Sequence, residues 1–271
     1  MNNGVNISYR KHQTAQASSA VIAGINTQIG QAAQLDEQPG YDAAPGVGQV
    51  KAQDEDSFVH LDYDPQTNIA NSFQFQAHND IKAPNGQVVV PGGLETSMSR
   101  DPNGVETYAQ KVPGGVAQQV VVDPQAQTIN LNGESVSFQE NQISQTASSI
   151  VATVNGQISN SAALDEQPGL DSAPGVGHVR AEDEASSMQL IYDPQTRAAK
   201  NFSFEAHQDI KAPNGQTVIS KGAKTSMSVD DNGVETYSQT IPMEDGRAFK
   251  QEVSVNEKSE TISYNEWILN S

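Results

Sequence analysis

Two acidic turns carry the residue types that could bind a metal ion. The segments DPNGVE at 101–106 and DDNGVE at 230–235 place carboxylate and amide oxygens around a glycine. Calcium prefers such hard oxygen ligands. The predicted ligands are the first aspartate, the asparagine and the glutamate of each turn: Asp101, Asn103, Glu106, Asp230, Asn232 and Glu235. The alternative is a hairpin turn that binds no ion, because Asp-Asn-Gly is also a common turn sequence and the twelve-residue calcium loop is incomplete here.

A histidine precedes an aspartate by two residues at two places, His78 with Asp80 and His207 with Asp209. Such a pair could act as a catalytic dyad or as part of a metal site, or the histidine could simply bond to its neighbours at a strand end. A hydrolase would also need a nucleophile in a motif such as GxSxG, and a zinc protease would need HExxH. The sequence contains neither motif. We therefore predict a protein that is not an enzyme and has no cofactor, with calcium as the one possible ion.

The balance of charges excludes several classes of partner. The chain of 271 residues carries a formal net charge of −18 and contains no cysteine. Nucleic acid and anionic membranes would repel such a chain, so neither is a predicted partner. The sequence has no stretch of 18 apolar residues and no apolar signal core near its first residues, which predicts a soluble chain without a signal peptide. The compartment stays open, and an extracellular or particle-surface location is included.

One long segment of the sequence occurs twice. LDEQPG begins at Leu35 and again at Leu164, so the offset is 164 − 35 = 129 residues. Three further motifs repeat at this offset: APGVG at 44–48 and 173–177, YDPQT at 63–67 and 192–196, and DIKAPNGQ at 80–87 and 209–216. Self-similarity at a fixed period is the signature of a duplicated structural unit. We predict a first repeat unit at 1–134 and a second at 135–271.

The boundary between the repeats resembles both ends of the chain. NISYRK at 6–11 is similar to SVSFQE at 135–140, and TISYNE at 261–266 is interpreted as a third version. A strand at each end would leave an unpaired edge, and such edges are templates for pairing with another chain. The predicted partner is therefore the protein itself or another protein, joined head to tail through the terminal strands. The apolar residues 267–269 would contribute to that contact or cap the last strand of their own unit.

Most of each unit is predicted to be antiparallel β structure. Short runs of alternating apolar and polar residues are separated by Asp/Asn/Pro/Gly turns, as in hairpins. Phe202 and Phe204 alternate with Ser203 and Glu205, so one face of that strand should be buried and the other wet. The predicted class is mainly β (α+β), a tandem duplication of an antiparallel meander or sandwich-like domain. The predicted core includes Phe73, Phe75, Phe202, Phe204, Ile81 and Ile210.

One segment has a different period. Between 142 and 163, apolar residues recur at helical spacing, at Ile143, Ala147, Ile150, Val154 and Ile158. The first copy carries Ile22, Ile25 and Ile29 within an Ala/Gln-rich stretch, a composition that favours helix. The alternative is a hairpin, because Asn155-Gly156 could supply a tight turn. We expect one helix before the strands of each unit.

A long segment with the pattern LDEQPG-x-D-x-APGVG follows the expected helix in both copies. It contains few apolar side chains, and loops of this length in a compact domain are usually functional or disordered. We predict that it either binds a ligand or crosses the sheet as a strap of fixed turns.

Two classes of function fit these features. The favoured one is a non-catalytic structural or interaction protein, a tandem β module that self-assembles or decorates a larger particle, filament or matrix. The alternative is a binding module for a small ligand, glycan or calcium, which would use the duplicated loops as two equivalent sites. An enzyme fits least well, because no nucleophile or cofactor motif accompanies the repeated histidines.

Overall fold

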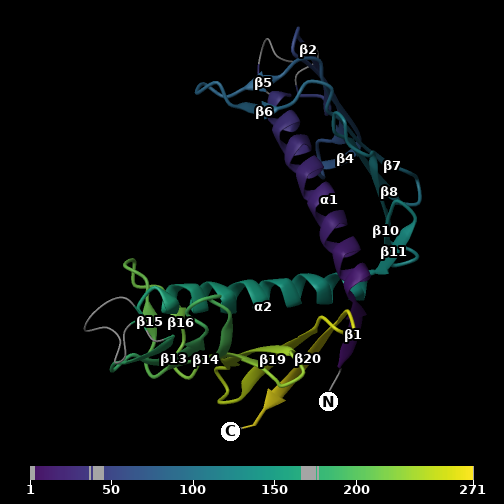
Figure 1. Ribbon diagram of the computed structural model, residues 1–271. Coiled ribbons are helices and arrows are strands. Elements are labelled where there is room, and N and C mark those ends of the chain that lie inside the picture. Colours follow the sequence, from purple (N-terminus) through teal and green to yellow (C-terminus); the bar gives the residue numbers. More distant parts are fainter. Residues whose placement is uncertain (1–3, 37, 39–45, 166–174, 176, 271) are drawn as a thin grey trace. The chain divides into compact units, whose positions relative to one another are not determined.

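The computed structural model describes residues 4–36, 38, 46–165, 175 and 177–270. Two long helices and two large antiparallel sheets make up most of this part of the chain, which confirms the predicted mainly β class (Figure 1). The chain divides into two compact units. We call Gln13–Asn141 the N-terminal unit, and Met1–His12 together with Gln142–Ser271 the C-terminal unit. No helix among the described residues is long and apolar enough to cross a membrane.

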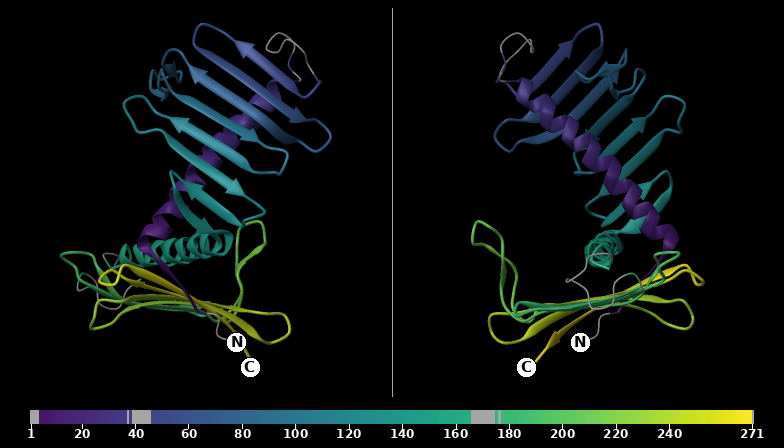
Figure 2. Two further views of the ribbon diagram at one scale, coloured as in Figure 1. Left: turned by 90° about the vertical axis from the view of Figure 1, so that its right-hand side faces the viewer. Right: turned by 60° about the vertical axis from the view of Figure 1, so that its left-hand side comes forward.

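In the N-terminal unit, helix α1 (Tyr9–Leu35) lies across one face of an eight-stranded sheet (Figure 2). The strand order is β11-β10-β9-β8-β7-β4-β3-β2, and a two-stranded hairpin of β5 and β6 is inserted between β4 and β7. The strand bounds are β2 (Gln49–Gln53), β3 (Ser57–Asp64), β4 (Ile69–Ala77), β5 (Ile81–Lys82), β6 (Val88–Val90), β7 (Glu95–Arg100), β8 (Glu106–Lys111), β9 (Gln118–Asp123), β10 (Thr128–Leu131) and β11 (Glu134–Ser137).

The C-terminal unit repeats this arrangement with helix α2 (Phe138–Ala162). Its strand order is β1-β20-β19-β18-β17-β14-β13-β12, and β15 and β16 form the inserted hairpin. The strand bounds are β1 (Val5–Ser8), β12 (His178–Glu182), β13 (Ser186–Tyr192), β14 (Ala199–Ala206), β15 (Ile210–Lys211), β16 (Thr217–Ile219), β17 (Lys224–Val229), β18 (Glu235–Pro242), β19 (Ala248–Asn256) and β20 (Thr261–Leu269). In both units the helix covers one face of the antiparallel meander.

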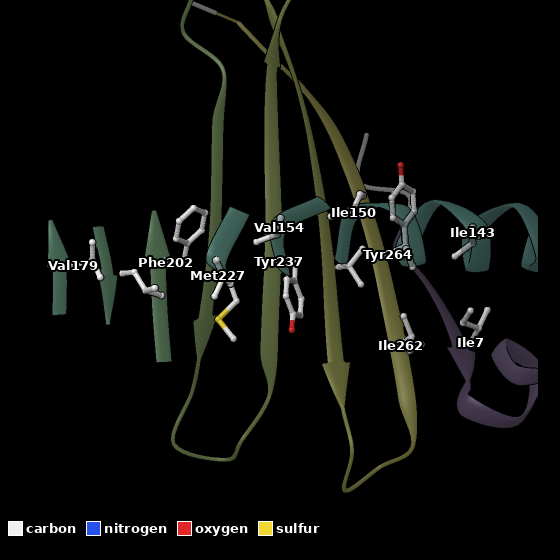
Figure 3. Packing of buried hydrophobic residues seen from close by; sticks show 14 residues of the cluster. Ile7, Ile143, Ile150, Val154, Val179, Phe202, Met227, Tyr237, Ile262 and Tyr264 are labelled. Carbon is white, nitrogen blue, oxygen red and sulfur yellow. The ribbon is translucent and has the colours of Figure 1, made fainter. Parts of the chain in front are cut away.

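Helix α2 forms where the apolar spacing predicts it. Its hairpin alternative is wrong, because Asn155 and Gly156 lie inside the helix on its exposed side. A capping box begins the helix: the Ser137 hydroxyl accepts a hydrogen bond from the Glu140 N–H at 3.1 Å, and the Glu140 carboxylate accepts one from the Ser137 N–H at 2.9 Å. Five side chains of α2 pack in the core of the unit: Ile143, Ala147, Ile150, Val154 and Ile158. Figure 3 labels the first, third and fourth of them.

Each unit has its own core between helix and sheet. Phe202 and its counterpart Phe73 are each 1% exposed, which confirms both as core residues. The other four predicted core residues are only partly buried: Phe75, Phe204, Ile81 and Ile210. The two phenylalanines still pack against the core clusters. The two isoleucines lie in the inserted hairpins, outside the large sheets, so their prediction as core residues is wrong.

The chain passes from one unit to the other at the start of each helix. β11 closes the N-terminal sheet and leads into α2, whereas β1 closes the C-terminal sheet and leads into α1. The repeat division at 134/135 and the division into compact units therefore differ. The compact units divide at 12/13 and 141/142, and the C-terminal unit includes the first residues of the chain.

The two terminal strands pair with each other inside one chain. β1 and β20 are antiparallel neighbours, with Val5 opposite Tyr264 and Ser8 opposite Thr261. The unpaired edges from which the head-to-tail contact was predicted are therefore occupied in this structure. TISYNE at 261–266 is also not a third boundary strand: it lies in β20, which occupies the place that β10 has in the N-terminal sheet.

Candidate binding grooves on the outer sheet faces

The outer face of each sheet, opposite the helix, carries a row of small and polar side chains. Side chains alternate between the two faces of a strand, so the neighbours of a buried phenylalanine point outward. In the C-terminal sheet the row consists of directly paired residues on β13, β14, β17 and β18: Gln189, Ser203, Ser226 and Ser238. The same row in the N-terminal sheet is His60, Gln74, Ser97 and Ala109. Each residue is separated from its counterpart by the repeat offset of 129.

One groove lies over the row of the C-terminal sheet, and a second lies over Gln74, Ser97 and Ala109 of the N-terminal row. The groove of the C-terminal unit has a volume of 580 Å³, and its lining includes Arg180, Gln189, Ser203, Glu205, Lys224 and Lys250. The groove of the N-terminal unit has a volume of 490 Å³, and its lining includes Phe58, Gln74, Gln76, Glu95, Ser97 and Lys111. The two linings share nine positions at the repeat offset, among them Gln74 with Ser203, Gln76 with Glu205, Glu95 with Lys224, and Ser97 with Ser226. The chain therefore presents a groove at the same place on both sheets, although the side chains at most of the named positions differ.

Ion pairs balance the charge in both grooves. Lys224 Nζ lies 3.0 Å from a carboxylate oxygen of Glu205, and Lys111 Nζ lies 3.1 Å from one of Glu95. The four side chains are between 44% and 58% exposed, so water screens both pairs and each contributes little to stability. These groups are accessible to a partner. Hydroxyl, amide and paired charged groups give each groove the chemistry of a hydrogen-bonding surface.

Lys250 extends the groove of the C-terminal unit toward the last strand. Its Nζ lies 3.1 Å from a Glu252 carboxylate oxygen and 5.0 Å from the centre of the Trp267 ring. Trp267 thus lies in β20 opposite Lys250 of β19 on its own sheet. The two residues after it, Ile268 and Leu269, are 47% and 41% exposed.

The aspartates predicted to bind calcium organise the turns between β7 and β8 and between β17 and β18. Asp101 Oδ1 accepts backbone hydrogen bonds from Asn103 at 2.8 Å and Val105 at 2.9 Å. Asp230 Oδ1 accepts two equivalent bonds, both at 2.8 Å, from Asn232 and Val234. The bond from Val234 is the largest cause that lowers the pKa of Asp230. One carboxylate oxygen in each turn is therefore used by the turn itself.

The glutamates of the same two turns bond to neighbouring tyrosines. Glu106 accepts a hydrogen bond from the Tyr108 hydroxyl at 2.8 Å and forms an ion pair with Arg100, and Glu235 accepts one from Tyr237 at 2.7 Å. Burial, followed by the hydrogen bond to the glutamate, raises the pKa of both tyrosines. Among the described residues, no group of three or more His, Cys, Asp and Glu side chains is placed to hold a metal ion.

We expect millimolar calcium to leave the melting temperature unchanged. An ion that binds only the native state raises the melting temperature by mass action, but the turn aspartates and glutamates already have internal partners. Thermal unfolding with calcium, and then with a chelator, measures this directly. A rise that the chelator reverses, and that Asp230→Asn reduces, would instead establish the predicted calcium site.

The repeated histidines do not form dyads with the aspartates that follow them. His207 Nε2 lies 3.1 Å from the Ser187 hydroxyl, and Asp209 Oδ1 accepts the backbone N–H of Lys221 at 2.8 Å. In the N-terminal unit Asp80 Oδ1 accepts the N–H of Gly92 at 2.8 Å. Within the described parts of the chain no hydrogen bond joins either histidine to its aspartate. His207 therefore fits the strand-end alternative, and at the other position the backbone N–H of His78 donates to the Asp56 carbonyl oxygen at 2.7 Å.

The duplicated segment LDEQPG-x-D-x-APGVG is held at both ends by its first aspartate. Residues 37, 39–45, 166–174 and 176 lie outside the described residues, so the predicted ligand site within the segment does too. Asp36 is 1% exposed, and its carboxylate accepts hydrogen bonds from Gly46 N–H at 3.0 Å, Gly48 N–H at 3.2 Å and the Tyr63 hydroxyl at 2.7 Å. Asp165 repeats these bonds with Gly175, Gly177 and Tyr192.

Neither the grooves nor the role of this carboxylate was predicted from the sequence. The signal for the grooves was the run of polar residues that alternate with core phenylalanines in both copies. The signal for the carboxylate was the retention of the aspartate, the two glycines and the tyrosine of YDPQT at one offset.

Comparisons with known proteins place the chain near no characterised group. No protein-family model matches the sequence, and no curated protein matches it. Among solved structures, the chain is similar to the di-domain ARO/CYC StfQ from the steffimycin biosynthetic pathway. The match covers 100% of this chain and 85% of that chain, with 8% sequence identity and a TM-score of 0.17. A TM-score this low carries no argument about fold or activity.

Proposed function

We propose that this chain is a non-catalytic structural or interaction protein that presents two equivalent polar sheet faces to its partner. The observation that supports this proposal is the duplicated groove, which lies at matching positions on the outer face of each sheet. Wet interfaces rich in hydrogen bonds are common between proteins. The outer faces offer that kind of surface twice in one chain.

Two equivalent sites in one chain favour a repetitive partner. When the first site is bound, the second binds at a high effective concentration, provided the spacing of the partner's sites allows both contacts. A repetitive partner is a filament, the surface of a particle or an assembly of copies of this chain. The net charge of −18 makes nucleic acid an unfavourable choice. The proposed role is therefore to self-assemble or to decorate such a partner.

The size of the purified protein tests this role. We expect light scattering to show species larger than one chain, and electron microscopy to show regular particles or polymers. A double variant, Ser97→Glu with Ser226→Glu, puts a charge into both grooves and should shift the distribution toward the monomer. The control variant, Gln87→Glu with Gln216→Glu, adds the same charges at matched exposed turns. A chain that stays monomeric at high concentration would count against self-assembly.

A binding module for a neutral glycan is the second candidate. The grooves have volumes of 580 and 490 Å³ and are lined by hydroxyl and amide groups, which suit a ligand with many hydroxyls. Calorimetric titration of the protein with a panel of neutral oligosaccharides tests glycan binding. Binding by a monomeric chain, lost in the Ser97→Glu/Ser226→Glu variant and kept in the control, would favour this candidate over assembly.

A further inference from the structure

The strand that closes the C-terminal sheet comes from the start of the chain. In β1, Ile7 is 2% exposed and belongs to the core cluster of the C-terminal unit. The helix that continues β1 belongs to the N-terminal unit from Gln13 onward. β1 and β20 are not joined by a turn, and the chain contains no cysteine that could join them. Noncovalent contacts therefore hold β1 on β20.

The β1–β20 pair repeats the β11–β10 pair. The facing residues are Ser8–Thr261, Ile7–Ile262 and Asn6–Ser263 in the first pair, and Ser137–Thr128, Val136–Ile129 and Ser135–Asn130 in the second. In both pairs the first residue of the following helix donates its backbone N–H to a carbonyl in the neighbouring turn at 2.9 Å. The difference is covalent, because the Asn132-Gly133 turn connects β10 directly to β11.

We propose that β1 exchanges between copies of this chain, so that β1 of one copy pairs with β20 of a second copy in the register found within one chain. β1 and α1 of the first copy would then follow β20 of the second copy, as β11 and α2 follow β10 within one chain. The internal order of strand and helix would continue from one copy to the next. This inference rests on the proposed self-assembly and names its partner, a second copy, and its contact.

The balance between the closed chain and the exchanged form depends on protein concentration. Both forms contain the same β1–β20 contacts, so these contacts favour neither form. In the closed form, β1 pairs with β20 of its own chain. This form is favoured because tethering gives β1 a high effective concentration at β20. When β1 leaves, β20 becomes an unpaired edge, which is a template for a strand from another chain. Exchange should therefore increase when chains refold together at high concentration, and it gives rings or open filaments.

Single-cysteine variants can detect the exchange because the natural chain contains no cysteine. Asn6 faces Ser263, and the burial of the neighbouring Ile7 places Asn6 on the outer side of the strand. Facing residues in antiparallel strands are close enough for a disulfide. Asn6→Cys and Ser263→Cys chains with different tags are refolded together at high concentration and then oxidised. We expect a disulfide-linked dimer that carries both tags.

The matched control mixes Ser135→Cys and Asn130→Cys chains, whose positions face each other within the connected hairpin of β10 and β11. We expect no mixed dimer from this pair. The Asn6→Cys/Ser263→Cys double variant should form an intrachain disulfide when dilute, which shows that the substitutions preserve the strand pair. With that disulfide formed, a mixed dimer that is absent, or equally abundant in the control, would overturn strand exchange. Assemblies seen by light scattering without a mixed dimer would reject the exchange alone, whereas a strictly monomeric chain would reject both proposals.

Discussion

Replacing Phe202 by alanine is expected to lower the free energy of unfolding of the C-terminal unit by about 3–5 kcal/mol, the usual cost of this truncation in a core. Phe202 is 1% exposed and packs in the cluster between α2 and the sheet (Figure 3). The truncation removes buried apolar surface and leaves a cavity. Trp267 is the only tryptophan and lies in the same unit, so its fluorescence during denaturant unfolding reports on this unit.

Phe204→Ala is the matched control for this experiment. Phe204 is on the same strand and the same face, but it is only partly buried beside the cluster. Less apolar surface is lost, so the destabilisation should be clearly smaller. Equal losses for the two variants would show that the strand is not buried as the structure has it. Phe73→Ala, in the other unit, should affect the Trp267 signal least.

The duplication was the most informative feature of the sequence because it predicts equal strand registers. Phe73 faces Met98 and Phe202 faces Met227, so both partners move by the same offset of 129. The apolar spacing favoured the helix but left a hairpin at Asn155-Gly156 as the alternative. The sequence SFQE at 137–140 would have decided between helix and hairpin, because Ser-x-x-Glu before an apolar run is the pattern of a capping box.

The layer that covers each sheet and the sheet that β1 joins were not predictable from the same patterns. Alternation along a strand indicates that one face is buried, but it does not say whether a helix or a second sheet covers that face. The resemblance of 6–11 to 135–140 was real, since both are strands that lead into helices. Which sheet β1 joins depends on contacts with residues about 250 positions away, such as Tyr264 beside Val5. TISYNE shares only the general alternation of a strand, and this led to its wrong assignment.

The role of the repeated sequence LDEQPG was also not predictable, because it depends on a buried charge. Asp165 is 1% exposed, and its carboxylate accepts bonds from Gly175 N–H at 2.9 Å, Gly177 N–H at 3.2 Å and the Tyr192 hydroxyl at 2.5 Å. Gly177 has a φ of +72°, and a Cβ there would lie 2.5 Å from the Tyr192 carbonyl oxygen. The aspartate thus holds the backbone of Gly175 and Gly177 just before β12.

Asp165→Ala is therefore expected to destabilise the C-terminal unit by on the order of 3 kcal/mol, since each buried donor left without its acceptor costs about 1–3 kcal/mol. Asp165→Asn should lose nearly as much, because its amide group would point a donor at donors. Tyr192→Phe removes one of the three bonds and should cost less than either. Denaturant unfolding followed by Trp267 fluorescence measures all three variants. If Asp165→Ala unfolds at the denaturant concentration of the natural chain, the carboxylate does not hold the segment. Because Tyr192→Phe keeps the ring, a cost larger than that of Asp165→Ala would show that the Tyr192 hydroxyl contributes through another contact besides this hydrogen bond.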